Sequence, residues 1–343
     1  MVVTLSSVLP SHGLQDFSIR TESGATVAGH YRGIDGSSIS SKSPVLVLLH
    51  GYPETNFMWR HIIRLLPKSI PIFAPDLPGY GVSSPVTGDT SASHTKRAVG
   101  KAILAALSGL LENNGNSGAK LPTPILLVGH DRGARVAHHL AIDAPLYAEK
   151  FTLAGTSVLD IVPTIIQWQG MANPAEGKGF FHWPLLANVD LATEMIQALG
   201  GDIFLRRMFD RWRGTLSPTC EQKLAQDGSY EIYEAAFKYE SVIRASCLDY
   251  AAGAKEDIDE QKVDQAEGKK VEVPTLVLYS ASGLGKRFDV PSSWKSWVHE
   301  PEKNMVHRAI GGGAGHFFAE ENPEETFGYL MEWFKNLGIY ETE

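Results

Sequence analysis

Apolar residues gather in short, nearly unbroken runs that alternate with segments of helical periodicity. Such runs are typical of strands that are buried on both faces of a parallel sheet. They cover Val45–Leu49, Ile70–Ala74, Ile125–Val128, Phe151–Leu159, Pro274–Tyr279 and Met305–Ile310. Helical patterns cover Thr95–Leu111, Gly133–Ile142 and Glu324–Leu337. The residues before Val45 indicate an antiparallel hairpin, so the chain predicts an α/β protein with a mostly parallel sheet flanked by helices.

Between about Val162 and Tyr250 the pattern is different. Aromatic residues are frequent there, and helical patches broken by Gly and Pro replace the buried-strand runs. We therefore expect a helical cap domain over residues 162–255, inserted into a core domain made of residues 1–161 and 256–343. The strongly charged segment Ala254–Lys270 is expected to be an exposed return from the cap to the core.

The composition narrows the possible partners and location. The chain has 31 Lys and Arg against 39 Asp and Glu, so it lacks the cationic character of proteins that bind nucleic acid or anionic membranes. Its two cysteines are too few for a disulfide framework, which favours a reducing compartment. The N-terminus lacks the basic and apolar segments of a signal peptide, and no apolar stretch approaches the roughly 20 residues that span a bilayer. We expect a cytoplasmic protein.

The first motif that carries chemistry is Gly129-His130-Asp131-Arg132-Gly133, between a predicted strand and a predicted helix. Its spacing is that of the G-x-S-x-G nucleophile elbow, with Asp in the serine position. A carboxylate held at such a turn can attack carbon and form a covalent ester, whereas it cannot perform the acyl chemistry of a serine hydrolase. A plain glycine-flanked turn is the alternative, and the position between strand and helix favours the elbow.

An oxyanion hole is expected beside this nucleophile. His50-Gly51-Tyr52-Pro53 follows the strand Val45–Leu49, where this architecture places a loop that donates a backbone N–H. The backbone N–H groups of Tyr52 and Arg132 would then stabilise the oxyanion that forms when water attacks the ester.

The general base and its acid partner lie further along the chain. His316 follows a Gly-rich loop late in the sequence, and we expect it to activate water. Two carboxylates could orient it. Asp160 ends a predicted strand at the catalytic edge, whereas Asp289 lies well downstream of the end of its strand, so Asp160 is favoured.

The order of the motifs HGYP, GHDRG and GGAGHF resembles that of the α/β-hydrolases whose nucleophile is aspartate, the dehalogenases and epoxide hydrolases. With GHDRGARVAHHLA, SVLDIVPT, FFHWPLLA and CLDYAAGA added, the chain resembles the fluoroacetate (haloacetate) dehalogenases from about His50 to its end. The resemblance implies an α/β-hydrolase fold with an eight-stranded sheet, chemistry without metal or cofactor, and a homodimer. The cap, the segment SGLGKRFDVPSSW and the expanded Gly-rich approach to His316 depart from the family pattern.

The resemblance also implies roles for individual residues. The triad would be Asp131 as nucleophile, Asp160 as acid and His316 as base. The substrate carboxylate would be held by Arg132 and Arg135, and the leaving halide by His182, Trp183 and Tyr250.

Physical reasoning agrees with the role of the two arginines. Arg132 and Arg135 follow Asp131 by one and four residues, so both guanidiniums could converge on one carboxylate and keep the nucleophile ionised. An ion pair on the helix is the ordinary alternative. For His182, Trp183 and Tyr250, simple packing within the cap is a serious alternative to anion binding.

The predicted reaction is hydrolysis of a small 2-halo carboxylate to the 2-hydroxy acid through an aspartyl ester, so the expected partner is a small anionic organic substrate. An epoxide hydrolase would share the same triad and would need cap tyrosines to protonate the ring oxygen. Candidates for that role are Tyr230, Tyr233, Tyr239 and Tyr250. A hydrolase for a larger, non-halogenated metabolite and a binding protein that has lost turnover are further alternatives.

Overall fold

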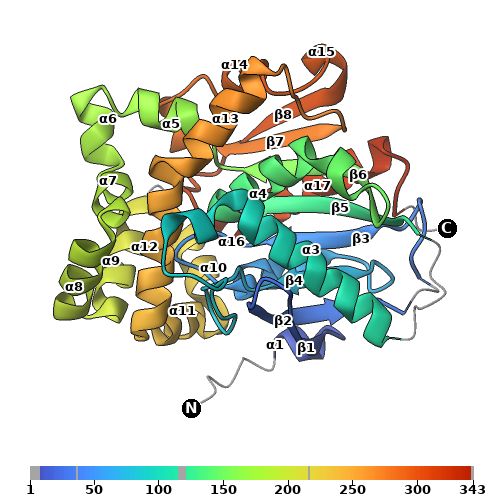
Figure 1. Cartoon of the computed structure of the whole chain (residues 1–343), viewed down its shortest axis with the longest axis horizontal. Coiled ribbons are helices and arrows are strands. Elements are labelled where there is room, and N and C mark those ends of the chain that lie inside the picture. Colours follow the sequence, from blue (N-terminus) through green and yellow to red (C-terminus); the bar gives the residue numbers. More distant parts are fainter. Residues whose placement is uncertain (1–7, 36–37, 115–120, 215–216, 341–343) are drawn as a thin grey trace.

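The structure is a computed structural model that describes residues 8–35, 38–114, 121–214 and 217–340 (Figure 1). The described residues contain one sheet whose strands are β1 (Gln15–Arg20), β2 (Thr26–Arg32), β3 (Val45–Leu49), β4 (Ile72–Pro75), β5 (Thr123–His130), β6 (Phe151–Leu159), β7 (Thr275–Ser280) and β8 (Met305–Ile310). This eight-stranded sheet has the order β1-β2-β4-β3-β5-β6-β7-β8. β2 pairs antiparallel with β1 and β4, and all other neighbours are parallel. The expected mostly parallel sheet is therefore confirmed.

The central strands form where the sequence is continuously apolar. Every side chain of β3 is 1% exposed or less, because helices cover both faces of the sheet there. The predicted bounds of β3, β6 and β8 agree with the structure, and those of β4, β5 and β7 differ by one or two residues. β1 and β2 form the expected hairpin at one edge of the sheet.

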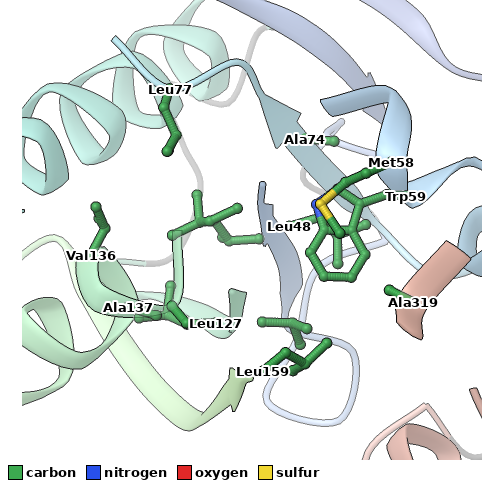
Figure 2. Close-up of a cluster of buried hydrophobic side chains, with 14 of the residues drawn as sticks. Leu48, Met58, Trp59, Ala74, Leu77, Leu127, Val136, Ala137, Leu159 and Ala319 are labelled. Atoms are coloured by element: carbon green, nitrogen blue, oxygen red, sulfur yellow. The ribbon is translucent and has the colours of Figure 1, made fainter. Parts of the chain in front are cut away.

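One group of helices of the core domain lies outside the cap. They are α1 (Val8–Ser11), α2 (Arg60–Leu65), α3 (Lys96–Asn113), α4 (Asp131–Ile142), α14 (Val290–Trp294), α15 (Pro301–Asn304), α16 (Phe318–Glu321) and α17 (Pro323–Asn336). Figure 2 shows side chains of the strands and of α4 meeting in the hydrophobic core. Among them are Leu48, Ala74, Leu127, Leu159, Val136 and Ala137.

A second group of helices lies between β6 and β7 in the chain. They are α5 (Thr164–Gly170), α6 (Pro174–Gly179), α7 (His182–Ala187), α8 (Val189–Leu199), α9 (Gly201–Trp212), α10 (Pro218–Ala225), α11 (Ser229–Phe237) and α12 (Glu240–Ala254). Figure 1 shows α6 to α9 together at one end of the sheet, at the left of the view. This arrangement supports the division that we propose, with residues 162–255 as the cap and residues 1–161 and 256–343 as the core. None of the helices in the described ranges is both long and apolar enough to cross a membrane.

The charged segment that follows the cap differs from its prediction. It forms α13 (Glu256–Ala266), and one face of this helix is buried against α3 instead of being exposed. Asp257 accepts hydrogen bonds of 2.9 Å from both the backbone N–H and the Nζ of Lys96. Asp264 accepts a hydrogen bond of 2.8 Å from the Nη2 of Arg97. A run of charges predicts a solvated surface only when no opposite charges face it, and here α3 supplies them.

Candidate active site

A strained turn joins β5 directly to α4. Asp131, the first residue of α4, has a φ of 43°, in the left-handed region that L-residues avoid. The flanking positions have no room for a side chain. A Cβ at Gly129 would lie 2.5 Å from the carbonyl oxygen of Gly133, and a Cβ at Gly133 would lie 2.3 Å from that of Leu49. The two glycines thus permit the turn that presents Asp131 at the carboxyl edge of the sheet.

The Asp131 carboxylate is buried and polarised. Its Oδ2 accepts a hydrogen bond of 3.1 Å from the backbone N–H of Tyr52, in the loop after β3. Burial alone would raise the pKa of the Asp131 carboxyl. The charges of His316, Arg132 and Arg135 outweigh burial and hold this pKa below its ordinary value. Asp131 is therefore ionised at neutral pH, the form that a nucleophilic carboxylate requires.

Two backbone N–H groups are predicted to donate to the oxyanion, those of Tyr52 and Arg132. The Tyr52 N–H already points at the Asp131 carboxylate, as the hydrogen bond shows. The N–H of Arg132 belongs to the first turn of α4, where backbone N–H groups have no acceptor within the helix. A second donor from this position stays a prediction.

His316 pairs with Asp160 at the same edge of the sheet. Its Nδ1 lies 2.7 Å from the Oδ2 of Asp160. The other carboxylate oxygen accepts from the backbone N–H and the hydroxyl of Ser280, at 2.7 and 2.8 Å. The alternative acid, Asp289, is exposed and caps α14 through a 3.2 Å bond from the Ser292 N–H. The geometry thus brings Asp160, and not Asp289, to the histidine.

A cavity of about 320 Å³ opens over these groups. It is lined by residues of the sheet edge, of α4 and of the cap. The predicted site residues among them are Asp131, Arg135, Asp160, His182, Trp183, Tyr250 and His316.

Arg135 is held in place by hydrogen bonds from its Nη1. Its Nη1 donates to the carbonyl of Val162 and to the hydroxyl of Thr164, both at 3.0 Å. Its guanidinium lies 4.6 Å from the centre of the Trp183 ring. Its buried Nε has no hydrogen-bond partner among the described residues. Burial lowers the pKa of Arg135 to about 10, which still leaves the side chain charged at neutral pH. Arg135 can therefore bind an anion within the cavity.

Arg132 is not among the described residues that line the cavity, and its buried Nη1 has no hydrogen-bond partner, so the expectation that both guanidiniums face one substrate carboxylate stays a prediction for Arg132. Its Nε donates to Asp249 Oδ2 at 2.5 Å, and its Nη2 donates to the Asp249 carbonyl at 2.8 Å. The Nζ of Lys96 lies 2.5 Å from Oδ1, the other carboxylate oxygen of Asp249. A carboxylate on α12 thus holds Arg132, and it lies 117 residues further along the chain, so the local spacing does not reveal it.

The three residues expected at the halide site lie together. The rings of His182 and Trp183 lie 5.7 and 5.6 Å from the ring of Tyr250. Burial lowers the pKa of His182 to about 3, so its ring is neutral, and its Nδ1 has no hydrogen-bond partner. Within the described residues, neither the indole N–H of Trp183 nor the hydroxyl of Tyr250 has a hydrogen-bond partner. Such free donors in a buried site suit an anion.

Comparison with known proteins identifies the family of this chain. A model of the alpha/beta hydrolase family matches residues 46–328. The chain belongs to this family. A fluoroacetate dehalogenase from Burkholderia sp is 27% identical over 309 residues, 89% of this chain and 92% of its own. A soluble epoxide hydrolase from Corynebacterium sp. (strain C12) is 27% identical over 300 residues, 85% of this chain and 90% of its own.

A solved structure of a candidate epoxide hydrolase from Pseudomonas aeruginosa is also similar to this α/β hydrolase. The TM-score is 0.76 at 27% identity, and the match covers 95% of this chain and 96% of the other. The relatives thus include dehalogenases and epoxide hydrolases at equal identity, and they establish the hydrolase family without fixing the substrate.

The α/β hydrolase also has a buried support for its base that the sequence analysis missed. The two ring nitrogens of His130 lie 2.9 Å from the His316 carbonyl and 3.0 Å from Glu54 Oε2. Burial raises the pKa of Glu54 to about 7. A protonated Glu54 can donate to Nδ1 of His130, whose Nε2–H then donates to the backbone of the base. Glu54 directly follows HGYP and His130 lies within the elbow motif, and these positions are the signal that could have found them.

Within the described residues, no group of three or more His, Cys, Asp or Glu side chains is arranged to hold a metal ion.

Proposed function

We propose that this α/β hydrolase replaces the halogen of a small 2-halo carboxylate with a hydroxyl group, through a covalent ester on Asp131. The observation that carries the proposal is that an ionised carboxylate, a histidine–aspartate pair and a buried arginine line one cavity. A nucleophile, a base for water and a cation for the substrate carboxylate are the groups that this reaction needs.

In the first step, one oxygen of Asp131 attacks the carbon that bears the halogen. The carbon–halogen bond breaks, and the halide leaves with the bonding electron pair. Arg135 holds the substrate carboxylate through its free Nε–H, while His182, Trp183 and Tyr250 donate hydrogen bonds to the departing halide. The product of this step is an ester between Asp131 and the 2-position of the acid.

In the second step, water attacks the carboxyl carbon of the Asp131 ester. His316 takes a proton from that water, and Asp160 stabilises the imidazolium that forms. The Tyr52 N–H, which lies 3.1 Å from Asp131 Oδ2, stabilises the oxyanion. The bond between this carbon and the substrate oxygen then breaks, and His316 returns the proton to the 2-hydroxy acid. The net reaction consumes water and releases halide and one proton.

Epoxide hydrolysis is the second candidate, because Tyr250 and His182 could donate a hydrogen bond to an epoxide oxygen. Epoxide hydrolysis on this fold usually uses two tyrosines of the cap to protonate the ring oxygen. Of the four tyrosines considered, only Tyr250 lies among the described residues that line the cavity. Tyr233, for example, donates to Glu320 at 2.9 Å, away from the cavity. Arg135 favours an anionic substrate over a neutral epoxide.

The two candidates are separated by assaying the same preparation with chloroacetate for halide release and with styrene oxide for the diol. We expect kcat/KM to be at least ~100-fold higher for chloroacetate and to be lost in Asp131→Asn. Diol formation without halide release would reject the proposal in favour of the second candidate.

A further inference from the structure

The outer part of the cavity is strongly basic. Besides Arg135, four cationic side chains line it, and the described carboxylates that line it are those of Asp131 and Asp160. The four cations are Arg211, Arg213, Lys286 and Arg287. They come from the end of α9 (Gly201–Trp212) and from the loop after β7, two segments that are far apart in the sequence. The loop belongs to SGLGKRFDVPSSW, which departs from the haloacetate dehalogenase pattern.

Carboxylates outside the cavity neutralise two of these cations. Arg213 pairs with Glu221 at 2.9 Å, and Arg287 pairs with Glu176 at 3.2 Å. The other two, Arg211 and Lys286, form no ion pair with any described residue, and both are exposed. Among the described residues, the outer cavity therefore keeps positive charge that no carboxylate balances.

Two of the outer arginines each pack over an aromatic ring of the cap. Arg211 lies over the ring of Phe181 at 5.1 Å, and Arg287 lies over the ring of Phe180 at 4.7 Å. These two rings directly precede His182 and Trp183, the donors at the deep end. One short segment of chain thus supports cations at the outer end and supplies hydrogen-bond donors at the inner end.

A glycine contributes to the same arrangement. A Cβ at Gly179 would lie 2.1 Å from Nη1 of Arg287, so the guanidinium rests where a side chain at this position would stand. The cavity of about 320 Å³ has the size of sites for ligands much larger than a two-carbon acid. A small haloacid bound at Asp131 and Arg135 would leave the basic outer part unused.

We propose that the substrate carries a second anionic group, a carboxylate or a phosphate, at the end remote from the reacting carbon, and that Arg211 and Lys286 bind it. The assignment rests on the proposed function, because that function places the reacting carbon at Asp131. It defines the substrate class as an elongated molecule with an anionic group at each end. Because both cations are solvent-exposed, their contribution is modest for each contact and is weakened by salt.

The test compares substrates that differ only in the distal group. 2-Bromoadipate and a 2-bromo acid of similar length with a terminal phosphate are compared with 2-bromohexanoate, which lacks the distal charge. For the wild type we expect kcat/KM to be about 10-fold or more higher for at least one of the two substrates with a distal anionic group, and comparing these two distinguishes carboxylate from phosphate. The double variant Arg211→Gln/Lys286→Gln should reduce this preference about 10-fold, and 1 M salt should reduce it similarly. The control Lys262→Gln/Lys303→Gln removes two exposed charges elsewhere and should keep the preference.

A binding measurement separates this inference from the proposed function. Titration calorimetry with adipate and hexanoate requires no turnover. If no bromo acid is hydrolysed, but adipate binds about 10-fold tighter than hexanoate and the double variant removes the difference, the distal site stands and the proposed function fails. If the bromo acids are hydrolysed but dianions and monoanions are equivalent in both turnover and binding, the second anionic group is rejected and the proposed function stands.

Discussion

The Oδ2 atom of Asp160 lies 2.7 Å from the Nδ1 atom of His316. This contact places the ring proton on Nδ1 and leaves Nε2 as the nitrogen that can accept a proton from water. The same contact identifies Asp160 as the acid partner of the two carboxylates considered in the sequence analysis, because Asp289 caps a helix instead.

Replacing the base should stop the reaction halfway. With chloroacetate, His316→Ala should release about one halide per protein molecule and then stall, because the Asp131 ester forms but water is no longer activated. Intact mass should show an adduct of one carboxymethyl group, and peptide mapping should locate it at Asp131. The double variant Asp131→Asn/His316→Ala serves as the control and should form no adduct, because it lacks the nucleophile. Steady halide release from His316→Ala at the wild-type rate would contradict the assigned base.

The two candidate acids provide a matched pair of substitutions. Asp160→Asn should lower kcat by on the order of 10³- to 10⁴-fold, because the amide cannot stabilise the imidazolium. Asp289→Asn should leave kcat within about 2-fold, since Asn also caps helices well. Ser280→Ala removes one of the two hydrogen bonds to Asp160 Oδ1 and should lower kcat about 10-fold. Equal losses in Asp160→Asn and Asp289→Asn would reject the assignment.

The two arginines after the nucleophile should separate into different phenotypes. Arg132→Met leaves Asp249 buried with one partner fewer, so the free energy of unfolding should fall by about 3–5 kcal/mol. Arg135→Gln should instead raise KM for chloroacetate about 10-fold or more, with a smaller loss of stability. Urea unfolding and steady-state kinetics on both variants measure the two effects. The assignment fails if Arg135→Gln leaves KM unchanged.

The buried carboxyls behind the base should make stability depend on pH. Burial raises the pKa of Glu320 from 4.5 to about 8, with a further increase from the neighbouring Glu54, while Arg60 opposes the shift. The folded protein then holds a proton that the unfolded chain releases above pH ~4.5. The stabilisation is fully present below that pH and is lost as the pH rises through about 8, by on the order of 1.4 kcal/mol for each pKa unit.

Urea unfolding at pH 5.5, 7 and 9 tests this dependence. The free energy of unfolding should decline by a few kcal/mol over this range, and Glu320→Gln should reduce the slope. The control Glu332→Gln changes an exposed glutamate that pairs with Arg308, and it should keep the wild-type slope. A Glu320→Gln profile parallel to that of the wild type would contradict the protonated carboxyl.

The parts of the fold that could be predicted were those that local sequence determines. The run Val45–Leu49 is a strand because five apolar residues in succession need burial on both faces. The elbow was visible because backbone atoms exclude a Cβ at both Gly129 and Gly133. The position of His316 after the last strand followed from chain order.

The parts that could not be predicted depend on contacts between distant segments. Arg132 is held by Asp249, from a cap helix that no local pattern connects to the elbow. The same limit applies to Arg211 and Lys286, which come from distant segments and line one cavity only in the folded protein. For Glu54 and His130, the pairing depends on how the loop after β3 approaches the end of β5 at the sheet edge.

The account depends most on the ester at Asp131, and a single turnover in water enriched in oxygen-18 tests it most directly. With protein in excess over chloroacetate, water should attack the carboxyl carbon of Asp131, so the label should enter this side chain and the first product should contain unlabelled oxygen. Mass spectrometry of the Asp131 peptide and of glycolate reads both sites. Label in the first glycolate and none at Asp131 would mean that water attacks the substrate directly, and would contradict the covalent mechanism.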